Sequence, residues 1–126
     1  MALPVDARIQ AAQSFVRNVR AAQDVLHQQD SSSAKARGAA LLASLKEARE
    51  HLRWNPSSGR PARFLQAHSF QGRALASRAA ALAAAHGVPE LREWVVKPYV
   101  LLYAHSDDRV VLLALRHERQ LAFELG

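Results

Sequence analysis

The last third of the chain contains three short runs of β-branched, aromatic and aliphatic residues, and these runs limit the possible fold more than any other feature. They cover residues 91–96, 99–104 and 109–116. Turn-forming residues separate them, first Lys97 and Pro98 and then Ser106, Asp107 and Asp108. Apolar runs of this length between turn residues are typical of strands. The sequence therefore predicts an antiparallel meander of three strands.

The first half of the chain has the apolar period of helices. Residues 6–29 are expected to form a helix with Asp6 as its N-cap. The apolar residues at helical spacing there are Ile9, Ala12, Val16, Val19 and Leu26. The polar run 30–33 breaks the period and is expected to cap a second helix that ends near Trp54. Two amphipathic helices joined by a short polar turn predict an antiparallel helical hairpin.

The segment between the hairpin and the strands contains both breakers and a third helical pattern. Residues 55–61 are rich in Pro, Ser and Gly and are expected to be loop, whereas 63–65 fit a brief strand. Residues 71–86 are Ala-rich in helical register, and Gly87 ends that helix. The tail 118–125 fits either a final strand or a short helix.

Helices followed by an antiparallel sheet define an α+β fold, in which the hairpin covers one face of the sheet. The 126 residues are enough for one hydrophobic core and too few for two. We therefore expect a single domain over residues 1–126.

The composition excludes several classes of site. Cysteine is absent, which removes disulfides, thiolate catalysis and Cys-ligated zinc. The six histidines lack the i, i+4 pairing of a metal-binding helix, so neither a metal nor another cofactor is expected. No apolar run approaches the roughly 18 residues of a membrane span, and residues 1–6 do not resemble a secretory signal. We expect a cytoplasmic protein without a membrane partner.

The net charge of +6 indicates the kind of partner. Of 17 basic residues only Lys35, Lys46 and Lys97 are lysines. The planar guanidinium group of arginine suits carboxylates and phosphates. Two partners fit this surplus, a nucleic acid or an acidic protein segment, although an Arg- and Ala-rich composition also follows from GC-rich coding.

A series of short motifs follows in fixed order through the second half of the chain. They are Asn55-Pro56, Gly59-Arg60-Pro61, Leu91-Arg92-Glu93, Tyr99-Val100-Leu101-Leu102-Tyr103, Asp107-Asp108-Arg109-Val110-Val111-Leu112-Leu113 and Arg116-His117-Glu118-Arg119. In this order they resemble the RelE/ParE family of toxins from type II toxin–antitoxin, or plasmid stabilisation, modules. The similarity is good over 91–120 and moderate over 41–61. It implies a RelE/ParE-like fold and a toxin that inhibits growth until an antitoxin neutralises it.

Three departures from the family pattern bear on the activity. Residues 64–88 insert about one helix before the sheet. Val100 stands where the family often has Arg, and Gln120 stands where it often has a second basic residue. In the mRNA-cleaving branch those two positions supply cations around the scissile phosphate. The resemblance therefore favours the ParE-like branch, which binds and poisons DNA gyrase, and makes an enzyme the less favoured interpretation.

Two alternatives remain: a RelE-like, ribosome-dependent mRNA endonuclease, or a non-toxic member that keeps only antitoxin binding. A nuclease would draw its base, proton donor and cations from a small set of residues. That set is Arg92, Tyr103, Arg116, His117 and Arg119. The simpler interpretation of His117 is an ordinary polar residue at a strand end, and that of Tyr99 and Tyr103 is core residues.

The resemblance also implies two binding sites. The expected target-binding residues are Arg92, Tyr99, Arg116, His117 and Arg119. The antitoxin is expected to be an acidic DNA-binding protein that forms an oligomer with the toxin, and its amphipathic segment would occupy the groove between hairpin and sheet. The expected antitoxin-binding residues are Arg60, Leu41, Leu45 and Trp94.

Overall fold

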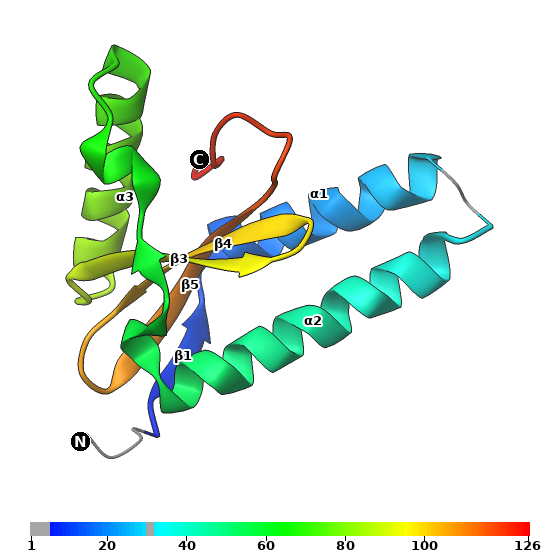
Figure 1. The fold of residues 1–126 in the computed structure, drawn as a ribbon, viewed down its shortest axis with the longest axis horizontal. Helices are drawn as coiled ribbons and strands as arrows, with labels where there is room; N and C mark the ends of the chain where they lie inside the picture. The colour runs from blue at the N-terminus through cyan, green and yellow to red at the C-terminus, as the bar shows by residue number, and fades with distance from the viewer. Residues whose placement is uncertain (1–5, 30–31) are drawn as a thin grey trace.

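The computed structural model describes residues 6–29 and 32–126; residues 1–5 and part of the expected turn, Asp30 and Ser31, lie outside this part. The elements follow in the order β1 (Arg8–Ala11), α1 (Gln13–Gln29), α2 (Ala34–Trp54), η1 (Pro56–Ser58), β2 (Arg60–Pro61), η2 (Arg63–Gln66), α3 (Phe70–Ala85), β3 (Glu90–Val96), β4 (Tyr99–His105) and β5 (Arg109–His117), where η is a 3-10 helix (Figure 1). This is the predicted α+β architecture, with a helical hairpin and an additional helix before the sheet.

The sheet has the strand order β1-β5-β4-β3-β2. β3, β4 and β5 are antiparallel neighbours, which confirms the predicted meander to within one residue at each strand end. A bulge lies in β5, because Leu102 pairs with Ala114 whereas Tyr103 pairs with Leu112. The extra residue is Leu113, which packs on the same side of the sheet as Ala114.

The structure corrects the expectation of one helix over residues 6–29. Arg8–Ala11 form strand β1, which pairs in parallel with β5, and α1 begins only at Gln13. Four residues are too few for apolar spacing to distinguish a strand from a helix. The segment forms a strand because it pairs with the edge of β5, which would otherwise be left without a neighbouring strand. The sheet is consequently mixed rather than purely antiparallel.

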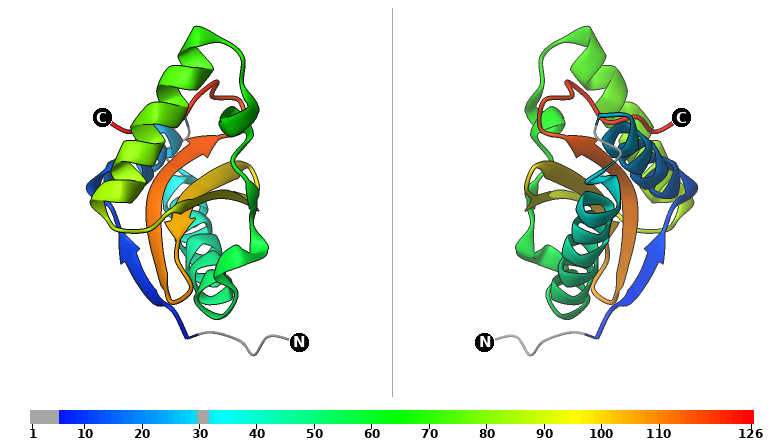
Figure 2. Two further views of the ribbon diagram at one scale, coloured as in Figure 1. Left: turned by 90° about the vertical axis from the view of Figure 1, so that its left-hand side faces the viewer. Right: turned by 90° about the vertical axis from the view of Figure 1, so that its right-hand side faces the viewer.

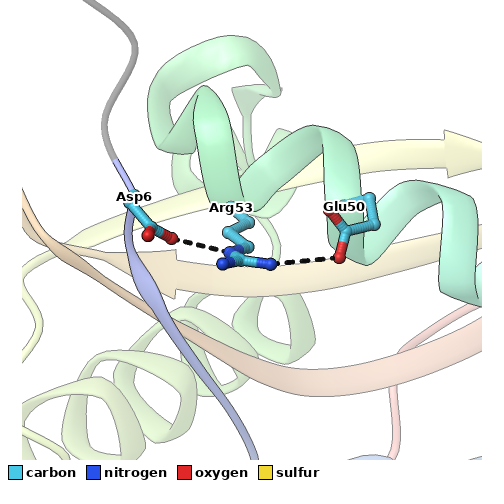
Figure 3. Close-up of polar contacts among 3 residues, drawn as sticks. All are labelled: Asp6, Glu50 and Arg53. Atoms are coloured by element: carbon cyan, nitrogen blue, oxygen red, sulfur yellow. Dashed lines mark hydrogen bonds and ion pairs between the residues drawn. The ribbon is translucent and has the colours of Figure 1, made fainter.

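Asp6 does not cap a helix, because its carboxylate pairs with Arg53 near the end of α2. The distance from Arg53 Nε to Asp6 Oδ1 is 2.6 Å, and Arg53 also contacts Glu50 at 3.4 Å (Figure 3). The hydrogen bond to Asp6 raises the pKa of Arg53. The main-chain amide of Ala7 donates to the carbonyl of Arg53 at 2.8 Å, so the start of β1 is fixed to the end of the hairpin.

Helix α1 completes the edge of β5 where β1 ends. The Ser14 hydroxyl donates to the Leu113 carbonyl at 2.5 Å, and Asn18 Oδ1 accepts from the Leu115 amide at 2.9 Å. These two side chains take the positions that backbone groups of a longer β1 would take. The outer edge of β5 is therefore paired beyond the last residue of its neighbouring strand.

Both faces of the sheet are covered. The hairpin packs on one face through buried residues such as Phe15, Leu45 and Leu52, together with Tyr99 and Tyr103 of β4. On the other face α3 contributes Ala79 and Ala83. Figure 2 shows the hairpin and α3 on opposite sides of the strands. The insertion at 64–88 thus has a clear structural role, since it covers an apolar face that the hairpin cannot reach.

The limits of α3 agree with the helix predicted at 71–86. The Ser69 hydroxyl accepts from the Gly72 amide at 3.0 Å and caps the N-terminus. Gly87 follows the helix with a φ of 73°, a backbone conformation that glycine adopts most easily.

Several short segments differ from expectation. Residues 63–65 form part of a 3-10 helix instead of a brief strand, and the loop expected at 55–61 includes a 3-10 turn and the two-residue strand β2. The tail after β5 forms neither of its two expected elements. Phe123 of the tail is nevertheless buried against Phe64 at a ring separation of 6.2 Å.

The close packing of residues 55–61 on the sheet can be tested by a substitution at Gly59. A Cβ atom there would lie 2.6 Å from the Glu93 carbonyl oxygen and 2.7 Å from the Tyr103 hydroxyl. We expect Gly59→Ala to lower the free energy of unfolding by about 2–3 kcal/mol, measured by urea denaturation. Gly38 in α2 has open space around it, so Gly38→Ala should stabilise by about 0.5–1 kcal/mol. Equal effects of both changes would contradict this packing.

Candidate functional site

Tyr103 holds the loop that precedes β2. Its hydroxyl donates to the Pro56 carbonyl at 2.6 Å and accepts from the Gly59 amide at 2.9 Å. The side chain is fully buried, and burial raises the pKa of Tyr103, while the Gly59 hydrogen bond and the charge of Arg92 act in the opposite direction. Because both hydrogen-bonding capacities of the hydroxyl are used internally, Tyr103 has a structural role in this state of the chain.

Arg92 is bound to the same loop. Its Nη1 donates to the Gly59 carbonyl at 2.9 Å, and its Nε donates to Nε2 of His105 at 2.9 Å. The His105 ring in turn contacts the Ser106 carbonyl through Nδ1 at 3.0 Å. Nε2 of His105 is therefore the acceptor, and Nδ1 carries the proton. This chain of contacts fixes the guanidinium group of Arg92.

Arg60 neutralises a buried carboxylate. Glu93 is only 2% exposed, and its Oε1 lies 3.2 Å from Nε of Arg60. The same oxygen accepts from the main-chain amide of Arg63 at 3.3 Å. A buried charge of this kind is tolerated only when it is paired, so the positive charge of Arg60 is already used within the chain.

Arg116 stabilises the C-terminal tail. Its Nη1 donates to the Gln120 carbonyl at 3.0 Å, and its guanidinium group lies 5.1 Å from the centre of the Phe123 ring. Phe123 belongs to the core on the α3 side, whereas the next residue of β5, His117, contacts Tyr99 on the hairpin side. Arg116 and His117 consequently lie on opposite faces of the sheet.

His117 and Arg119 line a cleft between α1, the end of β5 and the tail. The cleft has a volume of about 380 Å³. The His117 ring meets Tyr99 edge-to-face with centroids 5.4 Å apart, and its Nδ1 accepts from the Arg119 main-chain amide at 3.1 Å. Tyr99 is also part of the cleft wall.

The five candidate nuclease residues are therefore divided. Arg92 of β3 is paired with Tyr103 of β4, whereas His117 of β5 is paired with Tyr99 at the other end of β4. Tyr99 and Tyr103 are four residues apart in the strand, which corresponds to about 13 Å. Of the expected target-binding residues, the structure brings together Tyr99, His117 and Arg119 and places Arg92 and Arg116 elsewhere.

A larger apolar groove lies between α1, α2 and β1, with a volume of about 550 Å³. Val16 and Leu42 line it and are 39% and 48% exposed. Three basic side chains also line it, Arg20, Lys46 and Arg49. A binding role for these five residues was not predicted from the sequence, although Leu42 and the basic residues at the edge of the apolar stripe were visible signals.

The four expected antitoxin-binding residues do not form one surface. Leu45 contributes to the groove floor, and Leu41 is buried toward Tyr99. Trp94 stacks on His51 with ring centroids 4.5 Å apart, on the β3 side of α2. Arg60 lies in β2, at the far edge of the sheet.

Within 6–29 and 32–126, no group of three or more His, Asp or Glu side chains is placed to hold a metal ion. None of the helices in this part of the chain has the length and apolar character that crossing a membrane requires.

Comparison with known proteins gives one family. The family model described as ParE toxin of type II toxin-antitoxin system, parDE, matches residues 9–122. The match runs from β1 into the tail and includes the inserted α3. A comparison with curated proteins gave no match. The resemblance inferred from the motifs of the second half is thereby confirmed on the ParE side.

The two tyrosines of β4 form a matched pair for testing the role of Tyr103. Tyr103→Phe leaves the Gly59 amide and the Pro56 carbonyl without their partner, and we expect a loss of about 1–3 kcal/mol in the free energy of unfolding. The Tyr99 hydroxyl forms no hydrogen bond with the described residues, so Tyr99→Phe should change stability by less than about 0.5 kcal/mol. Urea denaturation of both variants measures these changes in the free energy of unfolding. A loss confined to Tyr99→Phe would refute this assignment.

Proposed function

We propose that this chain, which belongs to the ParE toxin family of type II toxin–antitoxin systems, acts in the cytoplasm by binding and poisoning DNA gyrase. Family membership implies a cognate antitoxin, and we propose that this antitoxin neutralises the toxin by direct binding. The observation that carries the proposal is the family match over residues 9–122, because it covers nearly every element of the fold.

The environment of two positions supports gyrase binding over mRNA cleavage. Val100 is 5% exposed and packs in the core on the α3 side of the sheet. The Gln120 side chain contacts its own turn, through the His117 amide at 3.4 Å and the Ala122 carbonyl at 3.2 Å. A nuclease needs cations that stabilise charge as it develops on the phosphate. Neither position supplies one.

The groove between α1, α2 and β1 supports the proposed antitoxin contact. Its apolar floor is suited to the apolar face of an amphipathic segment, and Arg20, Lys46 and Arg49 are suited to acidic residues beside that face. Within the described residues these three cations form no ion pair. Their charges are therefore available to a partner, unlike that of Arg60.

Charge reversal in the groove tests the antitoxin contact. We expect Arg20→Glu and Arg49→Glu each to weaken binding of the cognate antitoxin by about 5- to 30-fold, and the loss should shrink as salt rises. Isothermal titration calorimetry at two salt concentrations measures the affinity of each variant for the antitoxin. Arg17 is an exposed arginine of the same helix outside the groove, and Arg17→Glu is the control. Equal losses for all three variants would indicate general charge attraction and contradict groove binding.

Supercoiling and translation assays test the target. The purified chain should inhibit DNA supercoiling by gyrase, and adding the antitoxin should restore it. It should not cleave mRNA on ribosomes, and His117→Ala should leave that result unchanged. Codon-specific cuts that disappear with His117→Ala would establish the nuclease instead. Antitoxin binding without effect in either assay would identify a family member that has lost toxicity.

A further inference from the structure

We propose that the cleft between α1, the end of β5 and the tail binds a carboxylate-bearing segment of the target protein, with Arg119 and His117 as the recognising residues. This inference rests on the proposed function, because it assigns the surface through which a ParE toxin would contact gyrase. The hairpin groove is left to the antitoxin.

Arg119 is the available cation of the cleft. Its side chain is exposed and makes no ion pair or hydrogen bond among the described residues. Its position is nevertheless fixed, since its main-chain amide donates to Nδ1 of His117. A guanidinium group with no internal partner on a fixed backbone is suited to bind a carboxylate in two-pronged geometry.

His117 supplies a second donor beside it. Because Nδ1 accepts the Arg119 amide, the proton of the neutral ring lies on Nε2. The edge-to-face contact with Tyr99 holds the ring in place. Within the described part of the chain Nε2 has no partner, so this N–H is available to a ligand.

The rest of the lining indicates a protein segment rather than a nucleic acid. Ala21, Ala22 and Val25 of α1 form an apolar wall, and Val25 is 49% exposed. Nucleic acid binding depends on several cations placed along a phosphate backbone. This cleft contains one arginine and also a carboxylate of its own, Glu124. An acidic side chain next to an apolar one fits the cleft better than a row of phosphates.

The Glu124 carboxylate allows a second test, in which the expected change in affinity has the opposite sign. Its main-chain carbonyl accepts from Asn18 at 3.3 Å, which places the residue in the cleft, but its carboxylate pairs with no described residue. A ligand carboxylate bound at Arg119 would be repelled by Glu124. Removing that charge should therefore strengthen binding, whereas removing Arg119 should weaken it.

The experiment measures binding of purified gyrase subunits to the immobilised full-length chain. We expect Arg119→Gln to weaken binding by about 10- to 100-fold and Glu124→Gln to strengthen it by about 2- to 5-fold. His117→Ala should weaken it as well. Arg17→Gln, which removes an exposed charge from a part of α1 outside the cleft, should have no effect. All variants should bind the antitoxin as the unchanged chain does, which confirms their folding.

Each other outcome has a definite meaning. If the unchanged chain binds gyrase and Arg119→Gln binds it equally well, the cleft assignment is wrong while the proposed function stands. If the unchanged chain binds the antitoxin but neither gyrase subunit, the proposed function is wrong and this inference fails with it. Tight binding of a single-stranded RNA or a DNA duplex on the same sensor, lost on Arg119→Gln, would assign the cleft to nucleic acid and overturn the proposal.

Discussion

Strand β4 is buried along its whole length, and the rest of the structure depends on that burial. All seven of its residues are enclosed, so both faces of the sheet must be covered. Exposed apolar surface costs about 25 cal/mol for each Å². The hairpin covers one face, and α3 with Phe123 of the tail covers the other. Helix α3 is therefore needed to cover the second face of the sheet, where Val100, Leu102 and Val111 are buried.

Internal polar contacts decide which charges remain available to a partner. Arg60 and Arg92 are used by the buried Glu93 carboxylate and by the loop at Gly59. Arg116 holds the carbonyls of the C-terminal turn. These three arginines looked equivalent to Arg119 in the sequence. Only the structure distinguishes them, because burial and hydrogen bonding depend on contacts between residues far apart in the chain.

The sequence predicted the elements whose patterns are long, and it failed where patterns are short. Strands β3 to β5 and helices α2 and α3 follow directly from apolar period and turn residues. Strand β1 has four residues, too few to show a period, and its conformation depends on pairing with β5. The candidate site was only partly predictable. Arg116 and His117 are adjacent in sequence, but strand alternation sends them to opposite faces, and only a tertiary contact shows which face is open.

Helix α1 forms a wall of both surfaces for which partners are proposed. Val16, Val19 and Arg20 line the groove, while Asn18, Ala22 and Val25 line the cleft on the other side of the same helix. Ser14 and Asn18 attach this helix to β5, so it cannot shift without disturbing the edge of the sheet. A movement of α1 that accompanies binding at one surface would therefore also move a wall of the other surface. Where such a movement alters the affinity of one surface for its occupant, thermodynamic linkage requires the same factor at the other surface.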